Sequence, residues 1–251
     1  MKIKVLGSSA PYCKDERNCS GYLITNNNTK ILLDAGFGIT RNMKFPEDLN
    51  NLNIIISHLH KDHYAELFAI HYSCIVYNAH NKFDGVVNVY IPTVKETDKE
   101  YLDYLIIKKL QSNVFNIIEY DRSINGTYID DVRLDVMKNY HGDMNSYSIK
   151  LTSDKIITYS GDMSKRSIND LTLFSKDSNV LIIEASLLKD DVQIDNHLST
   201  IEAANVGINS NSKLIVFTHM FPETNKDKYV KEVKDISQNT IYASENDVIE
   251  V

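Results

Sequence analysis

Three histidines and one aspartate stand within six residues of this chain, in the segment His58-Leu59-His60-Lys61-Asp62-His63. Imidazole nitrogens and carboxylate oxygens are ligands that zinc and similar divalent metals accept. Four donors exceed the need of one metal that keeps a position open, so two adjacent metals fit better. The alternative is a solvated polar loop, because short motifs also arise without function. The segment therefore predicts part of a metal site whose other ligands lie elsewhere.

The segment follows the apolar run Leu52-Asn53-Ile54-Ile55-Ile56, which predicts a buried strand. Further ligand-type residues also stand where apolar runs end or near such ends: Asp34, His141, Asp162, His197 and His219. A single histidine in such a place is more often a structural residue than a ligand. Several such residues at strand ends favour a common site, because sites in α/β proteins gather at the edge where strands end.

The composition of the chain argues against several classes of protein. The chain has 251 residues and a net charge of −7, which gives no general attraction to nucleic acid or to an anionic membrane. No apolar stretch reaches the ~18 residues that a membrane-spanning helix needs, and the first residues lack a signal peptide. The three cysteines, Cys13, Cys19 and Cys74, form no CxxC pair and predict a reducing, cytoplasmic location.

Strand patterns dominate two stretches of the chain, and helical patterns follow each of them. Alternating or apolar runs at 2–6, 22–25, 30–33 and 52–57 begin the first half, and those at 132–137, 146–152 and 155–159 begin the second. Helices are predicted over 64–72, 97–111, 168–174, 200–208 and 227–236, with Ser199 and Glu202 forming a capping box. The pattern predicts an α/β protein with two sheets packed face to face, helices outside, and one domain over 1–251.

The segment 58–63 resembles the HxHxDH signature of the metallo-β-lactamase superfamily. Later elements occur in that superfamily's order: Leu32-Leu33-Asp34-Ala35-Gly36, then His141, Ser160-Gly161-Asp162 and Phe217-Thr218-His219. The resemblance covers nearly the whole chain. It implies the four-layer αββα sandwich of the metallo-β-lactamase fold.

Within the superfamily the chain looks most like the ribonuclease Z group. The segment Asn196-His197-Leu198-Ser199-Thr200, followed by Glu202-Ala203-Ala204, is similar to the segment in which that group places a proton-donating histidine. The resemblance also implies the remaining roles. His58, His60 and His141 hold a first metal, Asp62, His63 and His219 hold a second, and Asp162 bridges the two. Asp34 fixes the orientation of a ligand histidine.

The function implied is hydrolysis of a phosphodiester: RNA, a cyclic nucleotide or another small phosphodiester. Two divalent ions, zinc or else manganese or iron, share a hydroxide that Asp62 aims, and His197 protonates the departing alkoxide. The alternative for His197 is a residue that only packs at a helix start. Arg17, in a loop with Lys14 and near Tyr22, is a weaker candidate for gripping a phosphate.

Two features separate this chain from typical enzymes that process tRNA ends. The interval between His141 and Asp162 holds a simple hairpin instead of a flexible arm. The negative net charge of the chain also argues against the broad basic surface that binds tRNA. The alternatives are a lactonase or thioesterase that uses the same metals and a non-catalytic metal-binding regulator. The resemblance further implies a homodimer, and neither sequence nor resemblance predicts a membrane partner.

Overall fold

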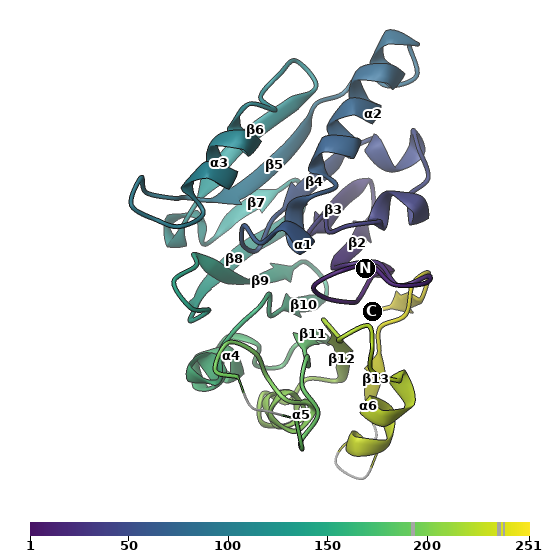
Figure 1. The fold of residues 1–251 in the computed structure, drawn as a ribbon. Helices are drawn as coiled ribbons and strands as arrows, with labels where there is room; N and C mark the ends of the chain where they lie inside the picture. Colours follow the sequence, from purple (N-terminus) through teal and green to yellow (C-terminus); the bar gives the residue numbers. More distant parts are fainter. Residues whose placement is uncertain (192–193, 235–236, 238) are drawn as a thin grey trace.

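The computed structural model describes residues 1–191, 194–234, 237 and 239–251. Figure 1 shows four layers: helices α2 (Leu67–Ala79) and α3 (Tyr101–Lys108), two sheets, and helices α4 (Ile168–Phe174) and α5 (Thr200–Asn209). The predicted αββα arrangement of an α/β protein is therefore confirmed.

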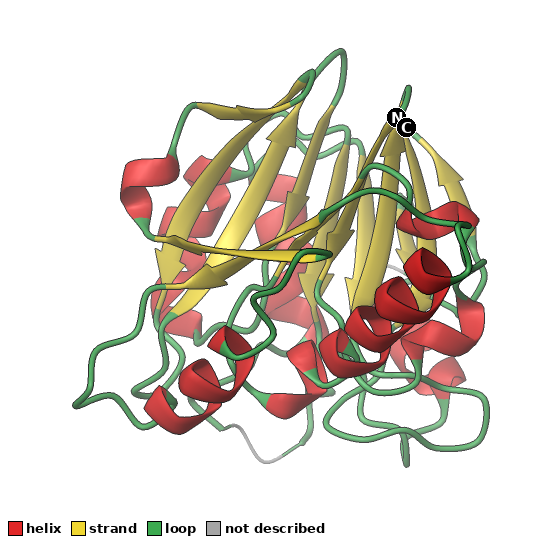
Figure 2. Cartoon of the chain, turned by 90° about the horizontal axis from the view of Figure 1, so that it is seen from above, coloured by secondary structure: helices red, strands yellow, loops and turns green. Residues whose placement is uncertain are grey.

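The first sheet has the strand order β14-β1-β2-β3-β4-β5-β6. Strands β3 to β6 run parallel, and the strands from β14 to β3 pair antiparallel. Strand β14, the last in the chain, pairs with β1, the first in the chain, so Figure 2 shows the two termini side by side. The bounds are β1 Lys2–Gly7, β2 Gly21–Asn26, β3 Thr29–Leu33, β4 Leu52–Ile55, β5 Val87–Pro92, β6 Phe115–Tyr120 and β14 Val248–Glu250.

The second sheet has the order β13-β12-β11-β10-β9-β8-β7. Strands β10 to β13 run parallel, and β7 to β10 pair antiparallel. The hairpin β9–β10 fills the interval between His141 and Asp162, as predicted. The bounds are β7 Thr127–Ile129, β8 Val132–Asn139, β9 Ser146–Thr152, β10 Ile156–Tyr159, β11 Val180–Glu184, β12 Leu214–Thr218 and β13 Thr240–Tyr242.

The predicted helices differ from the observed ones mainly in their ends. The helix predicted over 64–72 is two: α1 (Lys61–Tyr64), inside the histidine segment, and the longer α2. The helix predicted over 97–111 is confined to α3, and the one predicted over 227–236 begins in α6 (Lys226–Val233), with its predicted end outside the described residues. The capping box of Ser199 and Glu202 is present at the start of α5. No helix of the described residues is long and apolar enough to cross a bilayer.

Side chains alternate between the two faces of each strand, and the apolar ones fill three layers. In β3, Leu32 packs in the layer between the first sheet and its helices, whereas Ile31 and Leu33 pack between the two sheets. A third layer packs α4, α5 and α6 against the second sheet, with Leu181 and Phe217 among its members. These layers fix where strands β3, β4, β10, β11 and β12 end, and the candidate site residues follow those ends.

Gly207 lies where α5 approaches β12. A Cβ atom there would stand 2.2 Å from Ile215 Cδ1 and 2.4 Å from its Cγ1. At an open helical position the change to alanine would stabilise by up to about 1 kcal/mol. Here we expect Gly207→Ala to lower the free energy of unfolding by about 1–3 kcal/mol through overpacking, measured by urea denaturation. The double variant Gly207→Ala/Ile215→Val, which loses Cδ1, should recover part of this. A single variant more stable than the parent would contradict the packing argument.

Candidate metal centre

The histidine segment leaves strand β4 and enters α1, so its side chains meet at the edge where the strands end. His58 and His63 are fully buried, and Asp62 is 9% exposed. His58 Nε2 lies 3.0 Å from His60 Nδ1, which in turn lies 3.2 Å from Nε2 of His141, beyond the end of β8. These three imidazoles form a first group of nitrogen donors.

A second group forms around His219, which directly follows β12. Its Nε2 lies 3.2 Å from His63 Nε2 and 3.5 Å from Asp62 Oδ2. His219 has a φ of 59°, a left-handed backbone conformation that only tertiary packing maintains in a histidine. The second sheet thus supplies the residue that completes a group begun by the first.

Asp162 lies between the two groups. Its Oδ2 is 3.7 Å from His58 Nε2 and 3.8 Å from His141 Nε2 on one side. On the other side it is 3.1 Å from His219 Nε2 and 3.4 Å from His63 Nε2. Its Oδ1 is buried and has no hydrogen-bond partner within the described part of the chain. A buried carboxylate oxygen without a partner is costly, and a cation bound beside this carboxylate would remove that cost.

The histidine side chains are oriented by bonds from their second ring nitrogen. His63 Nδ1 donates to Asp34 Oδ2 at 2.7 Å, and His141 Nδ1 donates to the carbonyl oxygen of Asn196 at 3.0 Å. In the neutral imidazole these bonds place the lone pair on Nε2, which faces the centre, and this is the form that binds a metal.

Two serine hydroxyls orient two further histidines of the centre, His58 and His219. Ser57 Oγ donates to Asp34 Oδ2 at 2.8 Å, so it must accept from His58 Nδ1 at 3.1 Å. Ser186 Oγ donates to Glu184 Oε2 at 2.9 Å, so it accepts from His219 Nδ1 at 2.9 Å. A carboxylate therefore fixes each imidazole through one hydroxyl.

The two groups differ in charge when no metal is bound. Burial lowers the pKa of His58 well below its usual value and that of His60 to about 4. Burial also lowers the pKa of His219, but Asp162 and Asp62 outweigh it and hold that pKa at about 10. The pKa of His63 is raised in the same way. A cation binding beside His63 and His219 must therefore displace protons. The donor types and their spacing fit two divalent cations.

His197 lies beside the second group but is held differently. Its Nδ1 lies 3.0 Å from Glu184 Oε2, and its ring stacks on His219 with centroids 5.1 Å apart. Burial lowers the pKa of His197, but the Glu184 carboxylate more than offsets this and the pKa is raised. The same ring could also join Asp162 and His219 as a metal donor, since suitable atoms of the three lie within 4.8 Å of one another.

The structure brings together all the predicted site residues except Arg17. The Arg17 guanidinium donates to the carbonyl oxygens of Pro222 and Thr224 and so braces a loop, and Tyr22 is buried between the sheets. The predicted phosphate contact of Arg17 stays a prediction. Glu184 was missed by the sequence reasoning, although an acidic residue that ends the buried run Val180–Glu184 is the same signal that marked Asp34.

A cavity of about 590 Å³ opens over the two groups. Its wall includes His60, Asp62, Asp162, His197 and His219. This volume lies within the roughly 300–1,000 Å³ of small-molecule sites. The donors therefore face a space large enough for a substrate.

The fold and the two donor groups define a class: metal-dependent hydrolases with the metallo-β-lactamase fold. The family model described as anti-Pycsar protein Apyc1 matches residues 1–228, and the chain belongs to that family.

Relatives agree with this class. Ribonuclease Z of Archaeoglobus fulgidus is 24% identical in an alignment covering 100% of this chain and 97% of its own length. The crystal structure of the metallo-β-lactamase fold protein YhfI from Bacillus subtilis is similar with a TM-score of 0.85, 20% identity and 99% of each chain covered. That of the short form of human tRNase Z has a TM-score of 0.70, 20% identity, and covers 100% of this chain and 99% of its own. The predicted resemblance to the ribonuclease Z-like group is confirmed.

Replacing Asp34 with asparagine tests the support of His63. We expect Asp34→Asn to weaken zinc binding by about 10–100-fold, because the imidazole loses the anion that fixes its tautomer. Competition with a chromophoric chelator measures the affinity, and circular dichroism checks the fold. Tyr159→Phe is the matched control, since it removes another donor to Asp34 and leaves His63 untouched. An Asp34→Asn protein with parental zinc affinity would refute the role.

Proposed function

We propose that this chain is a dinuclear metal-dependent phosphodiesterase that acts on a small phosphodiester such as a cyclic nucleotide. His58, His60 and His141 would hold one divalent ion, Asp62, His63 and His219 the other, and Asp162 would contact both. Zinc suits a donor set made only of imidazole and carboxylate groups, and manganese and iron accept the same donors.

The observation that carries the proposal is the position of His197. It lines the cavity of the two donor groups, and its Nδ1 is bonded to the buried carboxylate of Glu184. The raised pKa favours the protonated imidazole, which is the form that can donate a proton. Expulsion of an alkoxide from a phosphodiester needs such a proton.

The residues divide the reaction among them. Two divalent ions held by the donor groups would lower the pKa of water and neutralise charge on the phosphoryl oxygens. Asp62, whose carboxylate borders the cavity, accepts a hydrogen bond from the attacking water and aims it at phosphorus. His197 gives its Nε2 proton to the leaving oxygen, while Glu184 stabilises the imidazolium before transfer.

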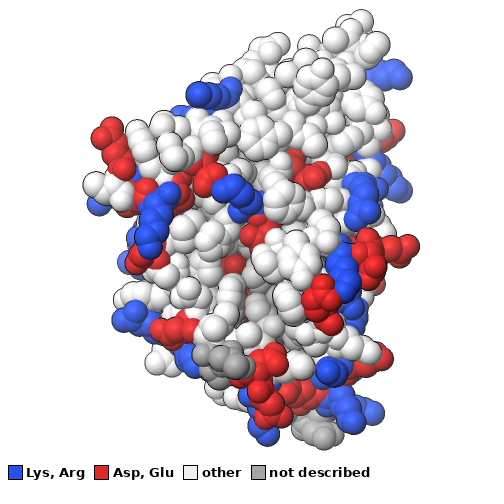
Figure 3. Space-filling model, in the orientation of Figure 1, with Lys and Arg blue, Asp and Glu red and all other residues white. Residues whose placement is uncertain are grey.

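The cavity mouth favours a small substrate over a long polyanion. Its two lysines are already paired, Lys61 with Asp103 and Lys99 with Asp143. The side chain of Phe37, 38% exposed, offers an aromatic face on which a base can stack. On the face drawn in Figure 3, basic and acidic side chains are intermixed and form no continuous basic stripe. A nucleic acid backbone gains little from such a surface.

A substrate panel tests the reaction class. Zinc- or manganese-loaded protein is assayed with bis-p-nitrophenyl phosphate, a 3′,5′-cyclic nucleotide, a lactone and a precursor tRNA. We expect turnover of the first two. Lactone turnover without phosphodiester turnover would overturn the proposal, and cleavage of precursor tRNA alone would overturn the small-substrate part. Metal analysis of active protein checks for two ions per chain.

Replacing His197 distinguishes a proton donor from a metal ligand. We expect His197→Ala to slow cyclic nucleotide hydrolysis by about 10²–10⁴-fold. Hydrolysis of bis-p-nitrophenyl phosphate should fall much less, because nitrophenolate leaves without a proton. Metal content should stay at the parental level. His80→Ala, which changes an exposed histidine, is the matched control. Equal losses on both substrates together with lost metal would show that His197 is a ligand.

Replacing Glu184 tests how the proton donor is tuned. Glu184 raises the pKa of His197, so Glu184→Gln should lower that pKa. The acid form would then disappear at lower pH, and the alkaline limb of the kcat/KM profile for the cyclic nucleotide should move to lower pH. The profile for bis-p-nitrophenyl phosphate serves as the internal control. An alkaline limb that stays in place would remove Glu184 from this role.

A further inference from the structure

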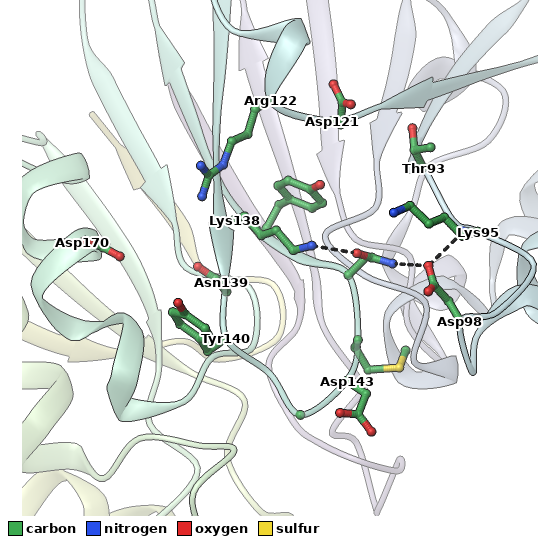
Figure 4. Close-up of a pocket in the computed structure, with 14 residues that line it drawn as sticks. Thr93, Lys95, Asp98, Asp121, Arg122, Lys138, Asn139, Tyr140, Asp143 and Asp170 are labelled. Atoms are coloured by element: carbon green, nitrogen blue, oxygen red, sulfur yellow. Dashed lines mark hydrogen bonds between the residues drawn. The ribbon is translucent and has the colours of Figure 1, made fainter.

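A second cavity, of about 630 Å³, lies beside the metal centre (Figure 4). Its wall comes from the loop after β5, the residues after β6, the end of β8 with the following loop, and α4. Of the residues that line it, only Met144 also lines the metal cavity. The loop of residues 141–145 thus separates two spaces, and the proposed reaction uses one of them.

Three cationic side chains line this second cavity: Lys95, Arg122 and Lys138. Figure 4 shows Lys95 and Lys138 reaching toward each other across the space, with Arg122 on the adjacent wall. None of the three forms an ion pair with a described residue. Lys138 Nζ donates to the amide oxygen of Asn145 at 3.0 Å. The cations therefore retain unused donors.

Three of the four carboxylates of the same wall have partners. Asp98 Oδ2 accepts from the backbone N–H of Lys95 and from Asn145 Nδ2, each at 2.9 Å. Asp121 accepts from the backbone N–H of Ser123 at 2.8 Å, and Asp143 pairs with Lys99. Figure 4 shows Asp121 and Asp143 pointing away from the two lysines. Asp170, on α4, completes the acidic set. Bonds from neutral N–H groups leave Asp98 and Asp121 charged, so an anionic ligand must bond directly to the unused cationic donors.

We propose that this second cavity binds a phosphate monoester of nucleotide size. The guanidinium of Arg122 can grip two phosphate oxygens at once, and the two ammonium groups add charge that a dianion needs. The volume exceeds that of inorganic phosphate alone, and the rings of Tyr140 and Tyr147 provide apolar wall for an organic body.

The ligand lies next to the loop that carries His141, and it competes with Asn145 for Lys138. Asn145 donates in turn to Glu100 Oε1, at 2.9 Å, and Glu100 lines the metal cavity. The second cavity therefore shares a wall with the metal centre but does not reach its donors. Binding there does not depend on the proposed reaction.

Calorimetric titration of the metal-loaded protein with adenosine 5′-monophosphate, and separately with inorganic phosphate, tests the proposal. The metal centre supplies one binding event, and we expect a second that Arg122→Gln/Lys138→Gln weakens at least about tenfold. Hydrolysis of bis-p-nitrophenyl phosphate without added nucleotide should stay unchanged in that variant. Arg122→Lys, which keeps the charge without the planar fork, should lose affinity only in part.

The matched control is Lys109→Gln/Lys213→Gln, which removes the same charge from exposed positions outside the cavity. It should bind the nucleotide like the parent. Tighter binding of the nucleotide than of inorganic phosphate supports a monoester with an organic body. A nucleotide isotherm identical in the parent and in Arg122→Gln/Lys138→Gln would overturn the proposal. The readout is binding, so it stands apart from any failure of the phosphodiesterase assay.

Discussion

The centre depends on the hydrogen bonds that the carboxylate of Asp34 accepts. It is fully buried and accepts from the backbone and hydroxyl of Ser57, from His63 and from Tyr159. Ser57 directly precedes the histidine segment, His63 ends it, and Tyr159 belongs to the opposite sheet. One anion thus holds the ligand loop to strand β3 and both to the second sheet. Four donors offset the large cost of burying that charge.

Glu184 is the corresponding buried carboxylate of the second sheet. Each carboxylate ends a buried strand, bonds one histidine directly and orients a second through a serine hydroxyl. The outcome differs because of what the directly bonded ring faces. His63 faces Asp62 and Asp162, whereas His197 borders the cavity. The same pairing therefore orients a histidine of a donor group in one half and a histidine that lines the cavity in the other.

Sequence reasoning located the centre because its signals are local. The segment 58–63 concentrates its donors in one loop, and His141, Asp162 and His219 each follow a strand whose pattern is readable. Tyr159 was missed because its bond to Asp34 exists only once the two sheets pack, whereas Glu184 carries the same strand-end signal as Asp34 and was overlooked. The bonds of Arg17 were not predicted because their acceptors, the carbonyls of Pro222 and Thr224, lie some 200 residues away in the chain. The ends of the helices were not predicted correctly, because tertiary packing decides where a helix stops.

The division of the donors between the sheets has a mechanical consequence. His58, His60, Asp62 and His63 come from the first half of the chain, and His141, Asp162 and His219 come from the second. Any cation they share is a cross-link between the two halves, and it resists sliding of one sheet over the other. Its binding free energy adds to the cohesion of the sandwich by mass action. Metal supply would then set the lifetime of the folded chain as well as its chemistry.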